Sequence, residues 1–347
     1  MTGNKKMTRR EALRNLGLLT AGVLAFSPSV MARATKTQDK KAVDKNTPSP
    51  VGALALPAVP VATLSNGVKL PRLGLGTFLQ PDNDVCKASC LAALKAGYRH
   101  IDTAHAYNDE EGVGRAIKES GIPREEICLV SKLWVSDYGA DGHTLKAIDE
   151  MLARLQTNYV DVLYVHQPVG EVLAAWKEME QTYKQGKVKA LGISNFDYPD
   201  PECDAIFDEI VKNSEIKPHI MQVECHPYAQ RLDVKKKIAP YNLQLECWYP
   251  LGGKWSNGVI LKDEVINKIA SARGKSAAQI ILRWHLQEGH SAIPGSTNPA
   301  HIQENINIFD FELTDDEMAQ IRALNKEQRL YTATYQQTKG FANGPRM

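Results

Sequence analysis

Four side chains that can exchange protons each stand at or just after the end of an apolar run. Asp102 ends residues 98–102, and Tyr107 follows it five positions later. Lys132 ends the run 127–132, and His166 ends the run 160–166. A carboxylate, a phenol, an ammonium and an imidazole gathered at one rim could transfer a proton to a carbonyl oxygen, so these residues favour an enzyme.

Apolar runs and amphipathic stretches alternate from residue 61 onward. The predicted strands are 72–76, 98–102, 127–132, 160–166, 190–194, 220–224, 244–249 and 291–293. The predicted helices include 84–96, 144–155, 172–185, 202–211 and 275–286. Strands that are apolar on both faces and separated by helices indicate a parallel sheet. Eight of them predict an α/β fold, a (β/α)8 TIM barrel, with the active site at the carboxyl ends of its strands.

Two further features bear on this fold. Asn66 and Gly67 lie between two short apolar stretches, which predicts an N-terminal β-hairpin over 63–70 with positive φ angles at both turn residues. A doubly wound open sheet is the competing fold, but it usually carries a GxGxxG turn after its first strand. The segment 74–77, Gly-Leu-Gly-Thr, lacks the third glycine, so the barrel is favoured.

Composition excludes some function classes. The 347 residues carry a formal net charge of +2, and no basic stripe interleaves with aromatic residues, so nucleic acid is not an expected partner. Cys86 and Cys90 are four positions apart, a spacing that could suggest a metal pair. No CxxC motif or close His–Cys cluster accompanies them, so we expect the six cysteines to be buried free thiols and predict no metal site.

The first 34 residues resemble an export signal. Lys5, Lys6, Arg9 and Arg10 precede a short apolar run over 16–26, and residues 8–13 resemble a twin-arginine signal. The run is shorter than the roughly 20 residues that span a bilayer, so no membrane anchor is expected in the mature chain. We expect a signal peptide over 1–34, a disordered linker over 35–60 and a periplasmic protein. A free N-terminus on a cytoplasmic protein is the alternative.

Seven segments, in order, are similar to those of aldo-keto reductases. They are 74–77 (Gly-Leu-Gly-Thr), 102–107 (Asp-Thr-Ala-His-Ala-Tyr), 111–114 (Glu-Gly-Val-Gly), 131–134 (Ser-Lys-Leu-Trp), 192–196 (Gly-Ile-Ser-Asn-Phe), 222–227 (Gln-Val-Glu-Cys-His-Pro) and 293–296 (Ile-Pro-Gly-Ser). The resemblance covers the expected barrel, residues 61–327, and leaves a C-terminal tail over 328–347 outside it. It implies a monomeric enzyme that reduces an aldehyde or ketone with NAD(P)H.

The resemblance also implies a role for each member of the tetrad. Tyr107 would give the carbonyl oxygen its proton, and Lys132 would lower the pKa of that phenol from about 10. Asp102 would keep Lys132 charged and in place. His166 would donate a hydrogen bond that orients the carbonyl and shares the developing charge.

The expected cofactor contacts follow the same resemblance. Ser194, Asn195 and Gln222 would hold the nicotinamide carboxamide, Trp248 would stack on its ring, and Leu251 and Gly252 would line the pyrophosphate path. The remaining expected contacts are Gly76, Thr77, Ser296, Thr297, His301, Glu304 and Asn305, the last two at the adenine. Many relatives carry a Lys and an Arg where this chain has Gly295 and His301. The missing cations weaken the preference for NADP over NAD, so NADP is the expected cofactor and NAD the alternative.

Other functions stay open at this point. Gln167 stands where Trp is frequent, so the substrate wall differs from that of many relatives, and the aromatic residues Trp134, Tyr138, Trp255 and Tyr331 are candidates for lining it. A regulatory subunit that senses nucleotide redox state would use the same barrel with little catalysis. A barrel isomerase or hydrolase without nicotinamide is a second alternative.

Overall fold

The computed structural model describes residues 58–343. Its ten strands are β1 (Val61–Thr63), β2 (Lys69–Pro71), β3 (Leu75–Gly76), β4 (His100–Asp102), β5 (Cys128–Leu133), β6 (Val162–Val165), β7 (Leu191–Ser194), β8 (Ile220–Glu224), β9 (Gln244–Trp248) and β10 (Ser291–Ala292). The predicted signal peptide and nearly all of the predicted linker lie outside the described residues.

The α-helices follow the strands in alternation. They are α2 (Asn83–Ala96), α3 (Glu110–Ser120), α4 (His143–Arg154), α5 (Val172–Lys184), α6 (Pro201–Asn213), α7 (Leu232–Ile238), α8 (Glu264–Arg273), α9 (Ala277–Gln287), α10 (Pro299–Ile306), α11 (Asp315–Arg322) and α12 (Tyr335–Lys339). Short 3-10 helices are η1 (His105–Tyr107), η2 (Arg124–Glu126), η3 (Val135–Asp137), η4 (Ala239–Tyr241), η5 (Lys254–Ser256), η6 (Ile260–Lys262) and η7 (Gly340–Asn343). Within the described part of the chain, no helix is long and apolar enough to cross a bilayer.

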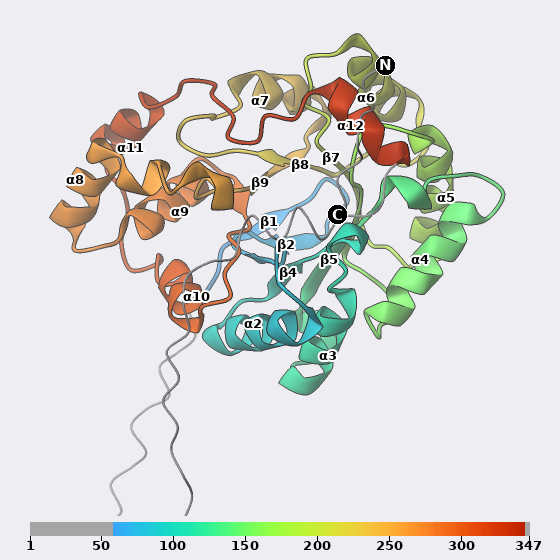
Figure 1. Cartoon of the computed structure of the whole chain (residues 1–347), viewed down its shortest axis with the longest axis horizontal. Coiled ribbons are helices and arrows are strands. Elements are labelled where there is room, and N and C mark those ends of the chain that lie inside the picture. Colours follow the sequence, from blue (N-terminus) through green and yellow to red (C-terminus); the bar gives the residue numbers. More distant parts are fainter. Residues whose placement is uncertain (1–57, 344–347) are drawn as a thin grey trace, which may run out of the picture. The chain divides into compact units, whose positions relative to one another are not determined.

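Strands β3 to β10 form one parallel sheet in sequence order, and helices surround it (Figure 1). The two outer strands meet through a parallel bridge between Leu73 and Ala292, and Gly74 N–H donates to the Ala292 carbonyl at 3.0 Å. The sheet therefore closes on itself, which confirms the predicted (β/α)8 barrel. The carboxyl ends of the strands agree closely with the predicted ones; β3, β4 and β6 are shorter than predicted by two or three residues.

The hairpin of β1 and β2 packs against the barrel interior at the amino ends of the strands. Leu64 and Leu70 are buried in one cluster with Val130, Val162 and Tyr164. The predicted turn is correct only in part, because Gly67 has φ of 92° whereas Asn66 does not have a positive φ. Asn66 acts through its side chain, which accepts from Val68 N–H at 3.2 Å and donates to the Lys189 carbonyl at 2.9 Å.

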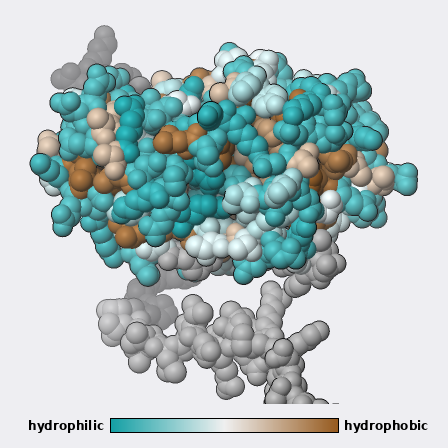
Figure 2. Space-filling model, turned by 90° about the horizontal axis from the view of Figure 1, so that it is seen from above, coloured by the Kyte–Doolittle hydropathy of each residue, from teal (hydrophilic) through white to brown (hydrophobic). Residues whose placement is uncertain are grey.

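Helix positions follow from capping and amphipathic pattern. Asp82 accepts from the amides of Asp84 and Val85 at the start of α2, and Ser276 and Gln279 form a capping box at the start of α9. Buried apolar side chains of α2 to α6 lie in one cluster with those of the strands, whereas those of α8 and α11 and most of those of α9 form a second cluster. The face shown in Figure 2 is mostly hydrophilic with scattered hydrophobic patches.

Candidate active site

The structure brings the four predicted proton-transfer residues together. Lys132 Nζ lies 2.5 Å from Asp102 Oδ1 and 3.3 Å from the Tyr107 hydroxyl oxygen, and it donates to the Thr103 carbonyl at 3.0 Å. Asp102 ends β4, Lys132 lies in β5, and His166 follows β6. Lys132 and Asp102 are 0% and 1% exposed, so their ion pair is held in a low dielectric beside the phenol.

A short 3-10 turn presents Tyr107 to Lys132. The turn η1 ends at Tyr107, and Asn108 then takes a left-handed conformation with φ of 59°, which Asn tolerates well. His105 Nδ1 lies 2.5 Å from Asp137 Oδ2 and so ties the turn to the loop after β5. The Phe78 ring packs on Tyr107, with ring centroids 4.9 Å apart. The phenol is thus fixed from both sides.

The pKa of the Tyr107 phenol moves in the direction opposite to the expected one. Burial raises this pKa well above its usual 10, and the carboxylates of Asp102, Asp109 and Glu246 raise it further. The ammonium of Lys132 lies 2.5 Å from Asp102 Oδ1, and the charge of that carboxylate offsets the charge of Lys132 at the phenol. The net shift of this pKa is therefore upward, because burial and the three carboxylates outweigh the lowering expected from Lys132. Tyr107 is a protonated phenol at neutral pH, as a proton donor requires.

His166 is a neutral imidazole held by its backbone. Burial and then the charge of Lys132 keep the pKa of His166 well below its usual range. The hydroxyl of Tyr138 accepts from the backbone amides of His166 and Gln167 at 2.7 and 3.1 Å. The Trp134 ring packs edge-on against the imidazole at a centroid distance of 5.1 Å. A neutral imidazole in this position can donate a hydrogen bond without competing with Lys132 for charge.

A buried carboxylate that the sequence analysis missed supports the tetrad from inside the barrel. Glu246, in β9, accepts from the Tyr164 hydroxyl at 2.8 Å and from Gln222 Nε2 at 2.6 Å. Gln222 Nε2 also donates to Asp102 Oδ2 at 2.9 Å. Burial, chiefly, raises the pKa of Glu246. The only signal in the sequence is a carboxylate inside a predicted strand.

One cavity of ≈ 400 Å³ opens beside the tetrad. Its walls include Gly76, Phe78, Leu79, Gln80, Asp102, Tyr107, His166, Gln167, Ser194, Asn195, Gln222, Trp248, Tyr249, Leu251, Lys254, Leu261, Gly295, Ser296, Thr297 and Tyr331. The volume suits a small organic ligand. Lys132 does not line the cavity; it is fully buried and contacts the Tyr107 hydroxyl oxygen at 3.3 Å.

The expected carboxamide contacts line this cavity but are also bonded to one another. Asn195 donates to the His166 carbonyl at 3.0 Å and accepts from the Trp248 indole N–H at 3.0 Å. The two N–H groups of Gln222 Nε2 donate to Asp102 and to Glu246. The side-chain carbonyl oxygen of Gln222 is therefore the group that can still accept a hydrogen bond from a carboxamide. These bonds fix the side chains before any ligand arrives.

The structure separates the other expected cofactor residues into two groups. Gly76, Leu251, Ser296 and Thr297 line the cavity. Thr77 is 0% exposed, and Gly252 is buried next to the cavity wall. His301, Glu304 and Asn305 lie on α10 and are not part of the cavity wall, with His301 exposed and Asn305 buried. Their contacts to an adenine or a 2′-phosphate therefore stay predictions.

The part of the cavity wall that follows β9 and β10 has few cations. Gly295 approaches β3 so closely that an added Cβ would lie 2.8 Å from the Gly76 carbonyl oxygen. A Lys at 295 would thus require the end of β3 or the loop after β10 to move. Lys254, in η5, is the one Lys or Arg among the described residues of the cavity wall. It was not predicted, since one Lys in a Gly-rich loop carries little signal.

The outer wall of the cavity is mainly apolar and includes the tail. Phe78, Leu79 and Leu261 line it, together with Gln167 and Tyr331, which were both predicted for this wall. Trp134 and Tyr138, which were candidates for this wall, are buried behind it and position His166 instead. The Trp255 side chain lies outside the described part.

A carboxylate at the end of β8 anchors the tail over the cavity. Glu224 accepts from the backbone amides of Leu330 at 2.6 Å and Tyr331 at 3.1 Å, and it pairs with Arg329 and His226, each at 3.1 Å. Burial acts to raise the pKa of Glu224, but His226, the Leu330 amide and Arg329 outweigh it and hold the pKa below its usual value. Through Tyr331, the tail contributes to the cavity wall.

Comparisons with known proteins agree with this geometry. The family model described as "Aldo/keto reductase family" matches residues 72–326. Glyoxal reductase of Bacillus subtilis is 43% identical over 77% of this chain and 93% of its own length. The 9,11-endoperoxide prostaglandin H2 reductase of Trypanosoma cruzi is 40% identical over 77% of this chain and 92% of its own.

A solved structure gives the same result for the fold. The aldo-keto reductase of Bombyx mori in complex with NADP superposes with a TM-score of 0.72 at 31% identity, covering 79% of this chain and 95% of that one. The family model spans well over half of the chain and includes all four residues of the tetrad. The chain therefore belongs to the aldo/keto reductase family.

Proposed function

We propose that this protein reduces an aldehyde or ketone to an alcohol with NADPH, reversibly, with Tyr107 as the proton donor. The observation that carries this function is Lys132 Nζ, held between Asp102 Oδ1 at 2.5 Å and the Tyr107 hydroxyl at 3.3 Å at the edge of a cavity. His166 lines the same cavity. A phenol and an imidazole at one wall can both reach a carbonyl oxygen.

The donor set fits a nicotinamide nucleotide. The side chains of Ser194, Asn195 and Gln222 carry hydroxyl and amide groups on the wall next to the indole of Trp248, which suits a carboxamide on an aromatic ring. When bound there, the reduced nicotinamide supplies a hydride to the carbonyl carbon. The Bombyx mori relative solved with NADP supports NADP rather than NAD.

The residues of this chain then act on the carbonyl oxygen. His166, neutral and donating, orients that oxygen and stabilises the negative charge that develops on it. Tyr107, a phenol that is protonated at neutral pH, gives the oxygen its proton. Lys132 stabilises the phenolate that remains, and Asp102 holds Lys132 in place. Protonation from solvent restores the phenol.

The test is an assay with a panel of small aldehydes and ketones, following the absorbance of NADPH. The relative named glyoxal reductase makes a dicarbonyl aldehyde the first substrate to try. Turnover that disappears in Tyr107→Phe supports the function. Tight NADPH binding without turnover of any carbonyl would favour the nucleotide-sensing subunit instead, and an absence of nucleotide binding would favour a barrel isomerase or hydrolase.

We also propose that the chain is a monomer that a bacterial twin-arginine system exports. Arg9 and Arg10 with the apolar run 16–26 support export, although this segment lies outside the described residues. The test fuses residues 1–60 to a reporter that is active only when folded before export. Periplasmic signal that is lost in the Arg9→Lys, Arg10→Lys variant supports the proposal, and signal confined to the cytoplasm contradicts it. Light scattering on the purified chain measures its oligomeric state.

A further inference from the structure

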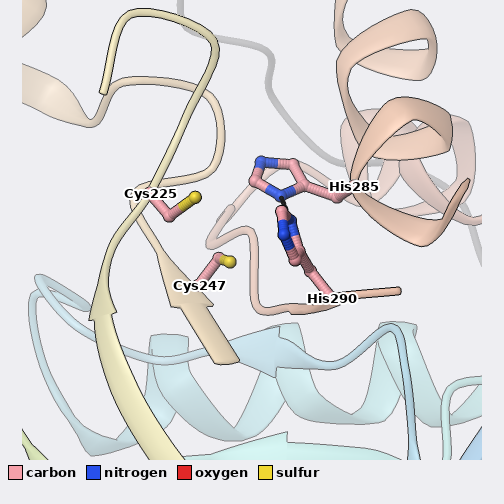
Figure 3. A group of neighbouring side chains, drawn as sticks. All are labelled: Cys225, Cys247, His285 and His290. Atoms are coloured by element: carbon pink, nitrogen blue, oxygen red, sulfur yellow. Dashed lines mark hydrogen bonds between the residues drawn. The ribbon is translucent and has the colours of Figure 1, made fainter. Parts of the chain in front are cut away.

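Two cysteines and two histidines that are far apart in the sequence meet in the wall of the barrel. Cys225 directly follows β8, Cys247 lies in β9, His285 lies in α9, and His290 directly precedes β10. One ligand atom from each lies within 4.8 Å of all the others. Figure 3 shows both sulfur atoms on the side of their strands that faces the imidazoles. We call these four residues the Cys2His2 cluster.

We propose that the Cys2His2 cluster binds one zinc ion. Two thiolates and two imidazoles are the donor set of many structural zinc sites, which are tetrahedral and closed. The sequence analysis predicted no metal site because the four residues have no motif spacing, and only the fold brings them together.

The distances fit a single tetrahedral ion. Zn–N bonds of about 2.0–2.1 Å and Zn–S bonds of about 2.3 Å place tetrahedral ligand atoms roughly 3.3–3.8 Å apart. One ligand atom from each of the four residues lies within 4.8 Å of all the others. Small side-chain rotations close that difference. A two-iron cluster would place the thiolates and imidazoles on separate irons and push the pairs farther apart.

An unsatisfied nitrogen is a second observation that points to a ligand. His290 Nε2 is buried and has no hydrogen-bond partner among the described residues. The Nδ1–Nδ1 contact also requires one imidazole to donate and the other to accept, so it satisfies only one N–H of the pair. Buried polar groups without partners call for an explanation, and a bound ion is one of the recognised ones.

Charge balance favours zinc with both thiols deprotonated. Cys225 and Cys247 are each 0% exposed, and two thiolates neutralise a divalent ion, so the loaded cluster buries no net charge. Lys235 and Arg72 are cations whose fields reach the cluster. Glu288 lies 3.6 Å from Lys235 and offsets part of that charge. The zinc ion displaces the thiol protons on binding.

A metal ion here would tie together the part of the barrel that carries the nicotinamide wall. Cys247 is the neighbour of Trp248, and its carbonyl accepts from Ile293 N–H at 3.2 Å after β10. Cys225 N–H donates to the Trp248 carbonyl at 3.3 Å. Four ligands would therefore join β8, β9, α9 and the start of β10, so the proposal predicts a zinc ion that stabilises this side of the barrel and takes no part in the reaction.

The first test measures metal in the full-length protein, purified without a metal-binding tag. Mass-spectrometric elemental analysis should give about one zinc ion per chain, falling about tenfold in Cys247→Ala and in His290→Ala. Cys203→Ala is the matched control, because Cys203 is an equally buried free thiol on α6 outside the cluster. It should keep its zinc. Wild-type zinc no higher than that of the two cluster variants would overturn the proposal.

A second measurement uses only the wild-type chain, in case a variant fails to fold. The protein is unfolded with a chelator and refolded with Co²⁺, which takes zinc sites and shows charge-transfer absorption from thiolate ligands. That absorption, together with slower thiol modification at Cys225 and Cys247 than in metal-free refolded protein, supports the site. Its absence, or a Cys225–Cys247 disulfide found in the purified protein by peptide mass, rules the site out.

Discussion

The two ends of the cavity are built in different ways. At the ends of β4 to β6, charges are buried, paired and fixed by several hydrogen bonds, as in Lys132 with Asp102. At the ends of β9 and β10, the wall combines apolar side chains and glycines with a few hydroxyls and one exposed lysine, Lys254. We therefore expect single substitutions in the tetrad to have large effects on catalysis. We expect single substitutions at the β9 and β10 end to have small effects on nucleotide binding, because each contact there is weak.

The largest effect should follow from removing the phenolic hydroxyl. Tyr107→Phe takes away the proton donor and leaves the cavity wall otherwise intact, so kcat/KM for carbonyl reduction should fall by about 10²–10⁴. The dissociation constant of NADPH, measured by quenching of Trp fluorescence, should stay within about threefold of the parent value, because the phenol is not expected to carry nucleotide binding. Turnover within about threefold of the parent would refute Tyr107 as the acid.

Breaking the buried ion pair should cost both stability and activity. Asp102→Asn leaves Lys132 charged and without its partner in the interior, which typically costs about 3–5 kcal/mol. Urea unfolding measures the free energy of unfolding. Asp149→Asn is the matched control, because the Asp149–Lys187 pair is exposed and should contribute no more than about 1 kcal/mol. Equal losses in the free energy of unfolding for the two variants would contradict the expected difference between the buried pair and the exposed pair.

Because the pKa of Tyr107 is raised, carbonyl reduction and alcohol oxidation should depend on pH in different ways. Burial and the nearby carboxylates keep the phenol protonated, so carbonyl reduction should be nearly constant from pH 6 to 8. Alcohol oxidation needs the phenolate, whose fraction rises about tenfold per pH unit below the pKa, so this rate should climb steadily into the alkaline range. Oxidation rates that level off near neutrality would show that Lys132 does lower this pKa.

The smallest effect is expected at the nucleotide end. Lys254→Ala removes the one cation of the described cavity wall, and loss of one exposed charge contact should raise the dissociation constant of NADPH by about threefold to tenfold. Lys262→Ala, a neighbouring exposed lysine outside the wall, serves as the control. An equal effect on NADH would place Lys254 at the pyrophosphate, and an effect on NADPH alone would place it at the 2′-phosphate.

The barrel and the tetrad could be predicted from the sequence because their signals are local. Apolar runs and helical periodicity mark the strands and helices, and Asp102, Lys132 and His166 each stand at or just after the end of such a run. Motif resemblance then gave Tyr107 its place. The hairpin turn was only half right, since the side chain of Asn66 and not its φ angle shapes the turn.

The remaining features of the site depend on contacts between distant segments. The support of Asp102 by Glu246 passes through Gln222, and the close approach of Gly295 to Gly76 follows from barrel closure. The pKa of Tyr107 is the sum of burial and three carboxylates on different strands or loops. The spacing of residues in the sequence does not show which distant side chains come together. These contacts and this pKa shift could therefore be found only from the structure.

The bonds from Glu224 to the tail have a consequence for how the substrate wall can change. The carboxylate is bound to the backbone amides of Leu330 and Tyr331, and every residue except proline offers such an amide. Side chains on this segment can therefore be exchanged while its path across the barrel mouth is preserved. Variation at Tyr331, which lines the cavity, is a route to new substrate preferences that leaves the tetrad unaltered.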